Sequence, residues 1–475
     1  MLLTVTRMRR RLPGTADSVT HLGMQLREMG WSPLGSTVAH RGAELALGQP
    51  TPSSTLYELT NASFNDDFVF LVSGVLYFSL EAERGDAEKR STLEAGAIHE
   101  LGTPPPAELA RLTSSLDAAL ARLTGEAPKS GSNGGIWQEL PWHPLSAAFS
   151  ALRERTLKQG GGSVSAGFPD FPEDVRQALR ILEDPERRKL ALRIKASEPL
   201  FVVREQEADS LNAASDALVD AGLAIRKILV RCRKRTDVNL ALLSSEDPAR
   251  LEGECPHCRA KLRDEQFLKG LAPTPLGSSL LDHSHWMTSR VAQSLRNCGV
   301  PPEDVLTEVS TEGGELDFLV SLYGSLAVME LKDRTFGLDD ARDLFDRYLR
   351  FGAQELIAVT TETIAPEARR RLEEAVRAVP RQPAPSITFV EGLAEMDAKV
   401  RLVVQRANWR AVARLLDKVA SAAMPLDAKA LVAAKFGIPI SKDRRGRRGS
   451  ASAGFDETMH EYLDLMAEVD VKSYS

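Results

Sequence analysis

The sequence predicts a multidomain protein of the mixed α/β class. Its 475 residues exceed the length of one ordinary domain and suggest about two to four domains. Runs rich in β-branched and aromatic residues are interspersed with segments of helical periodicity. Three stretches rich in Gly, Ser or Pro interrupt the chain, at residues 127–135, 159–167 and 441–454.

Composition narrows the functional classes. The chain is 43% hydrophobic and 27% charged, and its net charge of −6 excludes a protein that binds nucleic acid through a basic composition throughout. Four cysteines are too few for a disulfide scaffold and fit a reducing compartment. No apolar run reaches the roughly 18 residues of a membrane helix, and the N-terminus lacks the order of a secretory signal. We therefore expect a cytoplasmic protein without membrane contact, either monomeric or a homo-oligomer.

The N-terminal region, residues 1–126, is predicted to be an α/β domain. FVFLVSGVLYFSLEA (68–82) predicts strands with a turn at Ser73-Gly74, and residues 105–127 carry the Leu/Ala stripe of a helix. No residue in this region is identified as a catalytic or metal-binding candidate. Four arginines near the start are interpreted as a solvated terminus, with a phosphate-binding arm as the alternative: Arg7, Arg9, Arg10 and Arg11.

Two regions of less definite type follow. Residues 136–195 are predicted to be mostly helical, with prolines at plausible helix starts. Residues 197–270 read as strand, helix and strand, which suits either a winged-helix-like module or a small α/β module. At the other end of the chain, residues 396–475 are predicted to form a helical region that contains the basic linker 441–454.

A Cys-x-x-Cys pair at Cys255 and Cys258 has the spacing of a zinc knuckle. The upstream segment RCRKR supplies Cys232, but Arg235 stands where a ribbon would have its fourth cysteine. We therefore predict a degenerate zinc ribbon, with Zn²⁺ on these three cysteines or a ribbon without metal. Candidates for the fourth ligand are His257, His283 and His285, whereas Cys298 is expected to be a buried apolar residue.

The most informative stretch is GELDFLVSLYGSLAVMELKD, residues 314–333. Two β-rich runs flank Tyr323-Gly324, and a glycine at the second turn position suits a tight hairpin. With these two residues as the loop, Asp317 lies opposite Glu330, and Glu315 lies opposite Lys332. Side chains alternate along a strand, so all four lie on one face of the hairpin.

This arrangement of charges indicates a metal site. Directly opposed residues have Cβ atoms about 5 Å apart, and opposed like charges destabilise a hairpin. A divalent cation between Asp317 and Glu330 would remove the repulsion, and carboxylate oxygens suit Mg²⁺ or Mn²⁺. Lys332 on the same face could hold a water or a phosphate. The alternative is a solvated face of mixed charge. The opposite face is expected to be core: Leu316, Phe318, Val320, Met329 and Leu331.

The same segment resembles the core of the PD-(D/E)xK, restriction-endonuclease-like nucleases. Glu-Leu-Asp, a hairpin and Glu-Leu-Lys are similar to nucleases of CRISPR-associated and other prokaryotic defence proteins, and AQELIAVTTETIAPEARRRLEEA resembles the segment after the active site in Mrr-type endonucleases. The resemblance implies an α-β-β-β-α-β core over residues 280–395. It implies Asp317 and Glu330 as metal ligands, Lys332 as the third catalytic residue and Glu315 as an auxiliary acid.

The chain departs from the family pattern before the first strand. Many members carry an acid on the preceding helix, but HSHWMTSRVAQSLRNCG has none. Glu308 is the expected substitute as a metal ligand, with His283 or His285 as alternatives. On the other side of the site, four arginines on or near the next helix are candidates for contacts with nucleic-acid phosphates, Arg334 and Arg342 foremost: Arg334, Arg342, Arg347 and Arg350. Pairing of such arginines with neighbouring aspartates is the equal alternative.

These observations predict a metal-dependent endonuclease that cleaves DNA in a prokaryotic anti-phage defence or restriction system, together with protein partners. The residues do not choose between DNA and RNA. The first alternative is an inactive nuclease-fold protein that binds nucleic acid or acts as a scaffold. A second alternative is a transcriptional regulator built on residues 199–265.

Overall fold

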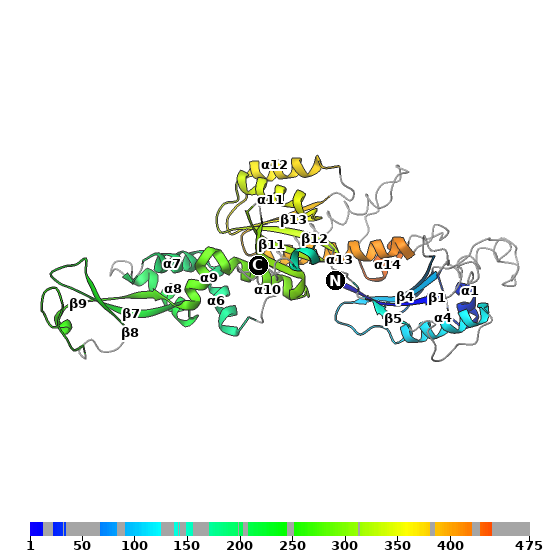
Figure 1. Ribbon diagram of the computed structural model, residues 1–475, viewed down its shortest axis with the longest axis horizontal. Coiled ribbons are helices and arrows are strands. Elements are labelled where there is room, and N and C mark those ends of the chain that lie inside the picture. Colours follow the sequence, from blue (N-terminus) through cyan, green and yellow to red (C-terminus); the bar gives the residue numbers. More distant parts are fainter. Residues whose placement is uncertain are drawn as a thin grey trace. The chain divides into compact units, whose positions relative to one another are not determined.

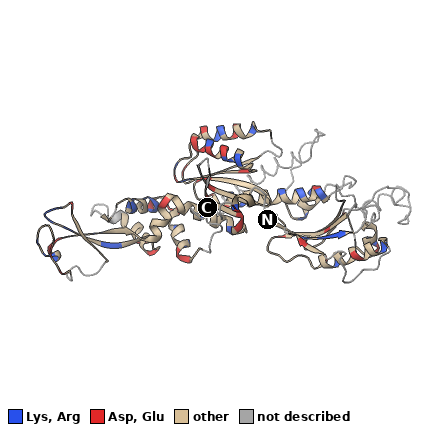
Figure 2. Ribbon diagram, viewed as in Figure 1, with Lys and Arg blue, Asp and Glu red and all other residues tan. Residues whose placement is uncertain are grey.

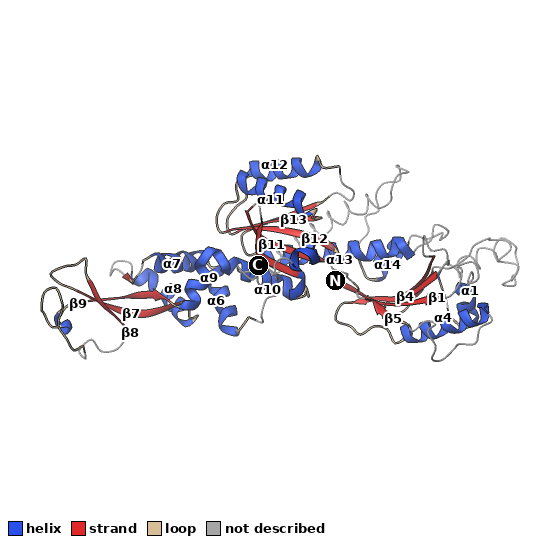
Figure 3. Ribbon diagram, viewed as in Figure 1, coloured by secondary structure: helices blue, strands red, loops and turns tan. Residues whose placement is uncertain are grey.

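The computed structural model (Figure 1) describes residues 1–12, 22–31, 33–34, 67–82, 91–124, 137–140, 142, 149–154, 171–197, 199–202, 208–244, 251–311, 314–380, 385–419 and 428–438. The three Gly/Ser/Pro-rich stretches of the sequence lie outside these residues. The chain is of the mixed α/β class (Figure 3) and divides into two compact units. Unit 1 comprises residues 1–150, 321–326 and 401–475, and unit 2 comprises residues 151–320 and 327–400.

Unit 1 is built on an antiparallel sheet of five strands in the order β2-β3-β4-β1-β5. The strands predicted within residues 68–82 are confirmed, since Phe70 pairs with Val75 across a short loop that contains Ser73-Gly74. The strand bounds are β1 Leu3–Leu12, β2 Asp67–Phe70, β3 Val75–Ala82, β4 Ser91–Glu100 and β5 Gln138–Leu140.

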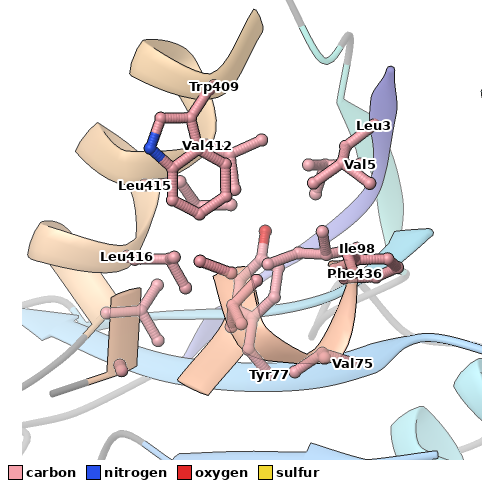
Figure 4. Packing of buried hydrophobic residues seen from close by; sticks show 14 of the residues in the cluster. Leu3, Val5, Val75, Tyr77, Ile98, Trp409, Val412, Leu415, Leu416 and Phe436 are labelled. Atoms are coloured by element: carbon pink, nitrogen blue, oxygen red, sulfur yellow. The ribbon is translucent and has the colours of Figure 1, made fainter. Parts of the chain in front are cut away.

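Helices cover both faces of this sheet, and the alternation of side chains along β3 explains why. Val75 and Tyr77 belong to the core beneath α13 (Met396–Val419) and α14 (Ala428–Lys435), as Figure 4 shows. Leu76 and Phe78 point to the other face and belong to the core beneath two further helices. Those helices are α1 (Leu22–Glu28) and α4 (Glu108–Thr124), the latter within the predicted segment 105–127.

The C-terminal helices therefore share a core with the N-terminal strands, so the regions 1–126 and 396–475 are not separate bodies in the structure. A second contact joins them, because the Asn408 side chain replaces a missing strand neighbour at Leu3. Its Oδ1 accepts from the Leu3 amide at 2.9 Å, and its Nδ2 donates to the Leu3 carbonyl at 2.7 Å. Because these residues are 405 positions apart, no local sequence pattern predicts this contact.

Three of the four N-terminal arginines, Arg7, Arg9 and Arg10, are neither a solvated terminus nor a free phosphate-binding arm, whereas Arg11 is exposed. They lie on β1, where Arg7 and Arg9 bind the buried Glu94 of β4 and Arg10 binds Asp117 of α4. Tyr77 also donates to Glu94, at 2.9 Å. Burial tends to raise the pKa of Glu94, but the hydrogen bonds and charge of Arg7, with those of Tyr77 and Arg9, hold that pKa below its usual value.

Replacing Glu94 by glutamine is expected to lower the free energy of unfolding of unit 1 by about 3 kcal/mol at neutral pH, because Arg7, whose side chain is only 15% exposed, then lacks its carboxylate. A carboxyl group with a depressed folded pKa stabilises above its ordinary pKa, and this contribution is lost as the pH falls through the folded value. The difference between wild type and variant in urea unfolding should therefore shrink on acidification below about pH 4.5. Glu139→Gln, at an exposed position of β5, is the control; an equal loss in both variants would contradict the role of Glu94.

The first part of unit 2 contains, among its described residues, helices α6 to α9 and an antiparallel sheet in the order β6-β9-β7-β8. Asp184 caps the second helix by accepting from the amides of Glu186 and Arg187, so one predicted helical segment is divided in two at Asp184-Pro185. The bounds are α6 Glu173–Glu183, α7 Pro185–Ala196, α8 Ala208–Asp220, α9 Pro275–Leu281, β6 Phe201–Val202, β7 Ala224–Arg231, β8 Asn239–Ser244 and β9 Gln266–Pro273.

The second part of unit 2 is a five-stranded mixed sheet in the order β10-β11-β12-β13-β14. β10 pairs antiparallel with β11, whereas β12, β13 and β14 are parallel. Helices α11 and α12 cover one face and α10 lies on the other (Figure 1). The bounds are α10 His285–Asn297, β10 Val305–Thr311, β11 Gly314–Leu322, β12 Ser325–Lys332, α11 Leu338–Phe351, β13 Glu355–Thr360, α12 Pro366–Arg377 and β14 Ser386–Glu391.

The core predicted for this sheet is confirmed. Its five members are buried: Leu316, Phe318, Val320, Met329 and Leu331. The opposite face is also buried along most of β12, including Leu326 and Val328, because α11 covers it. On this face of β12 the charged side chains, Glu330 and Lys332, therefore come at the carboxyl end of the strand. No helix in the described part of the chain is long and apolar enough to cross a membrane.

Candidate functional site

The candidate site begins with the hairpin that joins β11 and β12. Tyr323 and Gly324 both have positive φ, 51° and 77°, as a type I′ turn requires, so the predicted two-residue loop is confirmed. A loop of this type pairs Leu322 with Ser325, and an uninterrupted ladder from there places Asp317 opposite Glu330. The carboxylate of Asp317 accepts from the backbone amide of Leu331 at 2.7 Å. It is therefore held beside the peptide that links Glu330 to Leu331, one residue before Lys332.

Glu330 is the most buried acid of the site, with only 2% of its side chain exposed. Its Oε1 lies 2.6 Å from Lys332 Nζ, and its Oε2 forms an ion pair with Arg347 of α11. Two cations from two elements thus neutralise one buried carboxylate. This is the pairing that an ionised group in such a position requires.

Lys332 and Arg334 are more exposed than Glu330, and both lie near Asp340 at the start of α11. Lys332 Nζ is 3.9 Å from Asp340 Oδ1, and Arg334 binds both oxygens of Asp340 at 2.8 and 2.9 Å. Burial tends to raise the pKa of Asp340, but Arg334, the Gly337 amide and Lys332 hold it below its usual value. Asp340 thereby links the end of β12 to the helix that covers it.

Glu308 occupies a special position in β10. Its φ is 50°, in the left-handed region that a residue with a side chain rarely adopts. The pairing of β10 with β11 is regular on both sides of it, at Thr307 with Phe318 and at Val309 with Leu316, so Asp317 is the residue across from it. Its Oε1 lies 2.6 Å from Nδ1 of His285, the first residue of α10. One of the histidines proposed to replace the missing helix acid therefore contacts Glu308.

Strained backbone gathers around this site. In the described chain the non-glycine residues with positive φ are five, and three of them are Glu308, His283 and Ser284. Backbone strain of this kind costs about 1–3 kcal/mol per residue and is concentrated at functional sites. The strain favours a functional interpretation of this end of the sheet over a plain solvated face.

The acids do not form a divalent-metal centre as they lie. Both oxygens of Glu330 are in ion pairs, and Glu308 is held by His285. Among the described residues, the group of three or more side chains that could hold a metal lies elsewhere, and it includes none of Asp317, Glu330 and Glu308. The expected ligand set for Mg²⁺ or Mn²⁺ is therefore brought to adjacent strands without being gathered around one point. Glu315 pairs with Ser310 in the strand register, and its side chain lies outside the described part.

The two foremost arginines predicted to contact nucleic acid, Arg334 and Arg342, are paired with aspartates. Arg334 binds Asp340, as above, and Arg342 lies 3.3 Å from Asp339 on the exposed surface of α11. Helices α11 and α12 carry residues of both charge signs (Figure 2), so this surface is not a basic patch. The arrangement matches the alternative that the sequence left open, in which neighbouring acids pair with these arginines.

Sequence reasoning missed Asp333, and it considered Arg347 as a phosphate contact and not as the partner of Glu330. Asp333 follows Lys332 directly and joins three elements: its carboxylate contacts Arg188 at 3.2 Å, Trp286 Nε1 at 3.2 Å and Thr361 Oγ1 at 2.9 Å. Its position next to Glu-x-Lys is the only sequence signal that could have drawn attention to it. Arg347 is one of several arginines on its helix, and only the rotation of that helix selects it.

The metal-binding group of the described residues is the cysteine cluster. Cys232, Cys255, Cys258 and Glu265 each offer one ligand atom, and these four atoms lie within 4.8 Å of one another. The three cysteines are those predicted from the sequence. The fourth member is Glu265, not His257, His283 or His285, and His285 is bound to Glu308 instead. No sequence pattern distinguishes a glutamate that serves as the fourth ligand of a zinc ribbon from the other acids near it.

The side chains of this cluster are already in contact. Cys258 Sγ donates to Glu265 Oε1 at 2.8 Å, and this bond raises the pKa of the Cys258 thiol to about 12. Burial tends to raise the pKa of Cys232, but hydrogen bonds from the backbone of Arg235 and Lys234 lower it overall. Cys298, at the end of α10, is buried and outside the cluster, as expected of a small apolar residue.

Comparison with known proteins identifies no relative, so the interpretation of both sites depends on their geometry. No protein-family model, no curated protein and no solved structure matches the chain.

Proposed function

We propose that unit 2 carries a nuclease site that hydrolyses phosphodiester bonds, in DNA by preference. The observation that carries the proposal is the meeting of Asp317, Glu330 and Lys332 at one end of a hairpin in the middle of a mixed sheet. The order of elements supports it: α10, β10, β11, β12, α11 and β13 follow one another as in the α-β-β-β-α-β core of the PD-(D/E)xK nucleases.

The roles proposed for the residues follow from their contacts. Lys332 keeps 23% of its side chain exposed and is held by Glu330, so its ammonium is positioned to bind a phosphate oxygen and to stabilise developing negative charge. Glu330 positions that ammonium, and Asp317 is fixed beside the peptide that links Glu330 to Leu331. As they lie, the carboxylates of Glu330 and Glu308 are held in ion pairs and do not fit a divalent cation.

The test is cleavage of supercoiled plasmid, single-stranded DNA and RNA by the full chain in Mg²⁺, in Mn²⁺ and in a chelator. Lys332→Ala and Glu330→Gln are each expected to reduce cleavage by about 100-fold or more, as loss of a group that stabilises transition-state charge does. Lys429→Ala is the matched control, since Lys429 is also mostly buried and paired with one acid, Asp417. Cutting that survives in both site variants would place the activity elsewhere.

A second function is favoured by one observation, the full engagement of Glu330 by Lys332 and Arg347. It is an inactive nuclease fold that binds nucleic acid or serves as a scaffold. Binding of DNA or RNA by a folded wild type that cuts neither, in either metal, would support this function against the first. In both cases we propose a cytoplasmic protein that works with protein partners of a prokaryotic defence system.

For the cysteine cluster, we propose Zn²⁺ as the metal. Zn²⁺ binds thiolates, whereas Mg²⁺ and Ca²⁺ prefer oxygen ligands. A carboxylate oxygen is also an accepted zinc ligand. The role proposed for an ion held by these cysteines is structural.

A further inference from the structure

We infer that Glu265 is the fourth zinc ligand and that the ion takes the place of a hydrophobic core at the end of the β7–β9 ribbon. The inference rests on the zinc proposed for the three cysteines and is independent of the nuclease proposal. It adds a ligand that the cysteine pattern does not predict, and it gives the ion a function.

The strands bring the first two ligands together. β7 and β9 are paired as far as Arg231 with Gln266. Cys232 follows Arg231 directly and Glu265 precedes Gln266 directly, so both stand at the same end of two adjacent strands. Both are buried, with 0% and 1% of their surface exposed.

A tight turn supplies the other two ligands. The Cys255 amide donates to the Ala260 carbonyl at 2.7 Å, and the Arg259 amide donates to the Cys255 carbonyl at 2.9 Å. Arg259 takes a left-handed φ of 63°, which closes the turn. The bridge between Glu254 and Lys261 then holds its two arms together. Cys255 and Cys258 project from this turn to meet the pair from the strands.

The spacing of the four ligand atoms fits zinc. Zn–S bonds of about 2.3 Å in a tetrahedron place sulfur atoms roughly 3.8 Å apart. The four atoms all lie within 4.8 Å of one another, so a small inward movement of side chains would complete the shell. The second carboxylate oxygen of Glu265 accepts from the Arg233 amide at 2.6 Å, and this bond orients the first oxygen toward the thiols.

Burial explains why the ribbon needs an ion. Between Cys232 and Leu271, the buried residues of the described chain are Cys255 and Glu265, and neither is a large apolar side chain. The apolar cluster on these strands is small and consists of Leu200, Leu229 and Ala272, with Val202 and Leu268 packed against it. A segment of this length without apolar burial has little to offset its conformational entropy, which a structural metal commonly offsets in small modules.

The test measures metal on the full chain, purified under reducing conditions. Wild type is expected to hold about one Zn²⁺ per chain, and its Co²⁺ form should show thiolate-to-metal absorption with the intense visible bands of a tetrahedral site. Glu265→Ala is expected to weaken Zn²⁺ at least 10-fold in competition with a chromophoric chelator. Glu265→Cys should restore binding, and Cys298→Ser, at the buried cysteine outside the cluster, should leave it unchanged.

Failures of the two ideas are distinguishable. Two results would overturn both the zinc proposal and the inference. One is a wild type that takes up neither Zn²⁺ nor Co²⁺, and the other is a wild type whose cysteines are joined in a disulfide. Wild-type binding that Glu265→Ala leaves intact, with Cys258→Ser abolishing it, would overturn Glu265 alone. Hydrogen exchange supplies the readout for the role of the ion: chelation should expose the amides of residues 251–265 while those of β13 stay protected.

Discussion

Replacing Arg347 by methionine is expected to lower the free energy of unfolding of unit 2 by about 3 kcal/mol. The guanidinium of Arg347 and the ammonium of Lys332 share the charge of Glu330, whose side chain is 2% exposed. Removal of Arg347 leaves that carboxylate buried with one cation, and an undercompensated buried charge is among the costliest changes a folded protein can undergo. Denaturant unfolding of the full chain, followed by a probe in unit 2, measures the loss.

Two further variants separate the ion pair from lost packing. Glu330→Gln combined with Arg347→Met should recover part of the stability, since the orphaned charge is then absent. Arg342→Met, on the same helix but in an exposed pair with Asp339, should cost less than about 1 kcal/mol. A double variant that is as unstable as the sum of the two single variants would refute the coupling.

Replacing Leu416 by alanine is expected to destabilise unit 1 by about 2–5 kcal/mol. Leu416 lies on α13 with no exposed surface, in the core that α13 and α14 form with Val75, Tyr77 and Ile98 (Figure 4). The lost side chain leaves a cavity between a C-terminal helix and N-terminal strands. The variant should therefore accelerate hydrogen exchange in β1, β3 and β4 as well as in α13.

Leu349→Ala on α11 is the matched control, because the same atoms are removed from a residue that is 44% exposed. It is expected to change stability by less than about 0.5 kcal/mol. If exchange in Leu416→Ala rises in α13 and stays unchanged in the strands, the helices and the sheet do not form one cooperative core.

The parts of the fold that the sequence predicted are those with local signals. Tyr323-Gly324 between two β-rich runs predicted the hairpin, and the loop follows from the two positive φ values that a type I′ turn needs. The apolar alternation around it predicted the buried face at Leu316, Phe318 and Val320. Because both signals act over a few residues, one sequence is sufficient to detect them.

The parts that escaped prediction depend on contacts between distant segments. Asn408 bonds Leu3 across 405 positions of sequence, and no local pattern marks either residue for the other. Arg347 reaches Glu330 only because of the orientation of α11 about its own axis over the sheet. The sequence likewise drew attention to cysteines and histidines for the metal, whereas the end of β9 supplies a carboxylate. The charge neutralisation of Glu330 and the identity of the fourth ligand are therefore results of tertiary structure.

The most direct test of the nuclease site is single-turnover nicking of supercoiled plasmid by the full chain in Mn²⁺, comparing wild type with Lys332→Ala. Circular dichroism first establishes that both are equally folded. The proposed site predicts nicking by wild type and a rate at least about 100-fold lower in the variant. Equal nicking by the two proteins, or none by a wild type that binds the plasmid, would contradict a catalytic role for the end of β12.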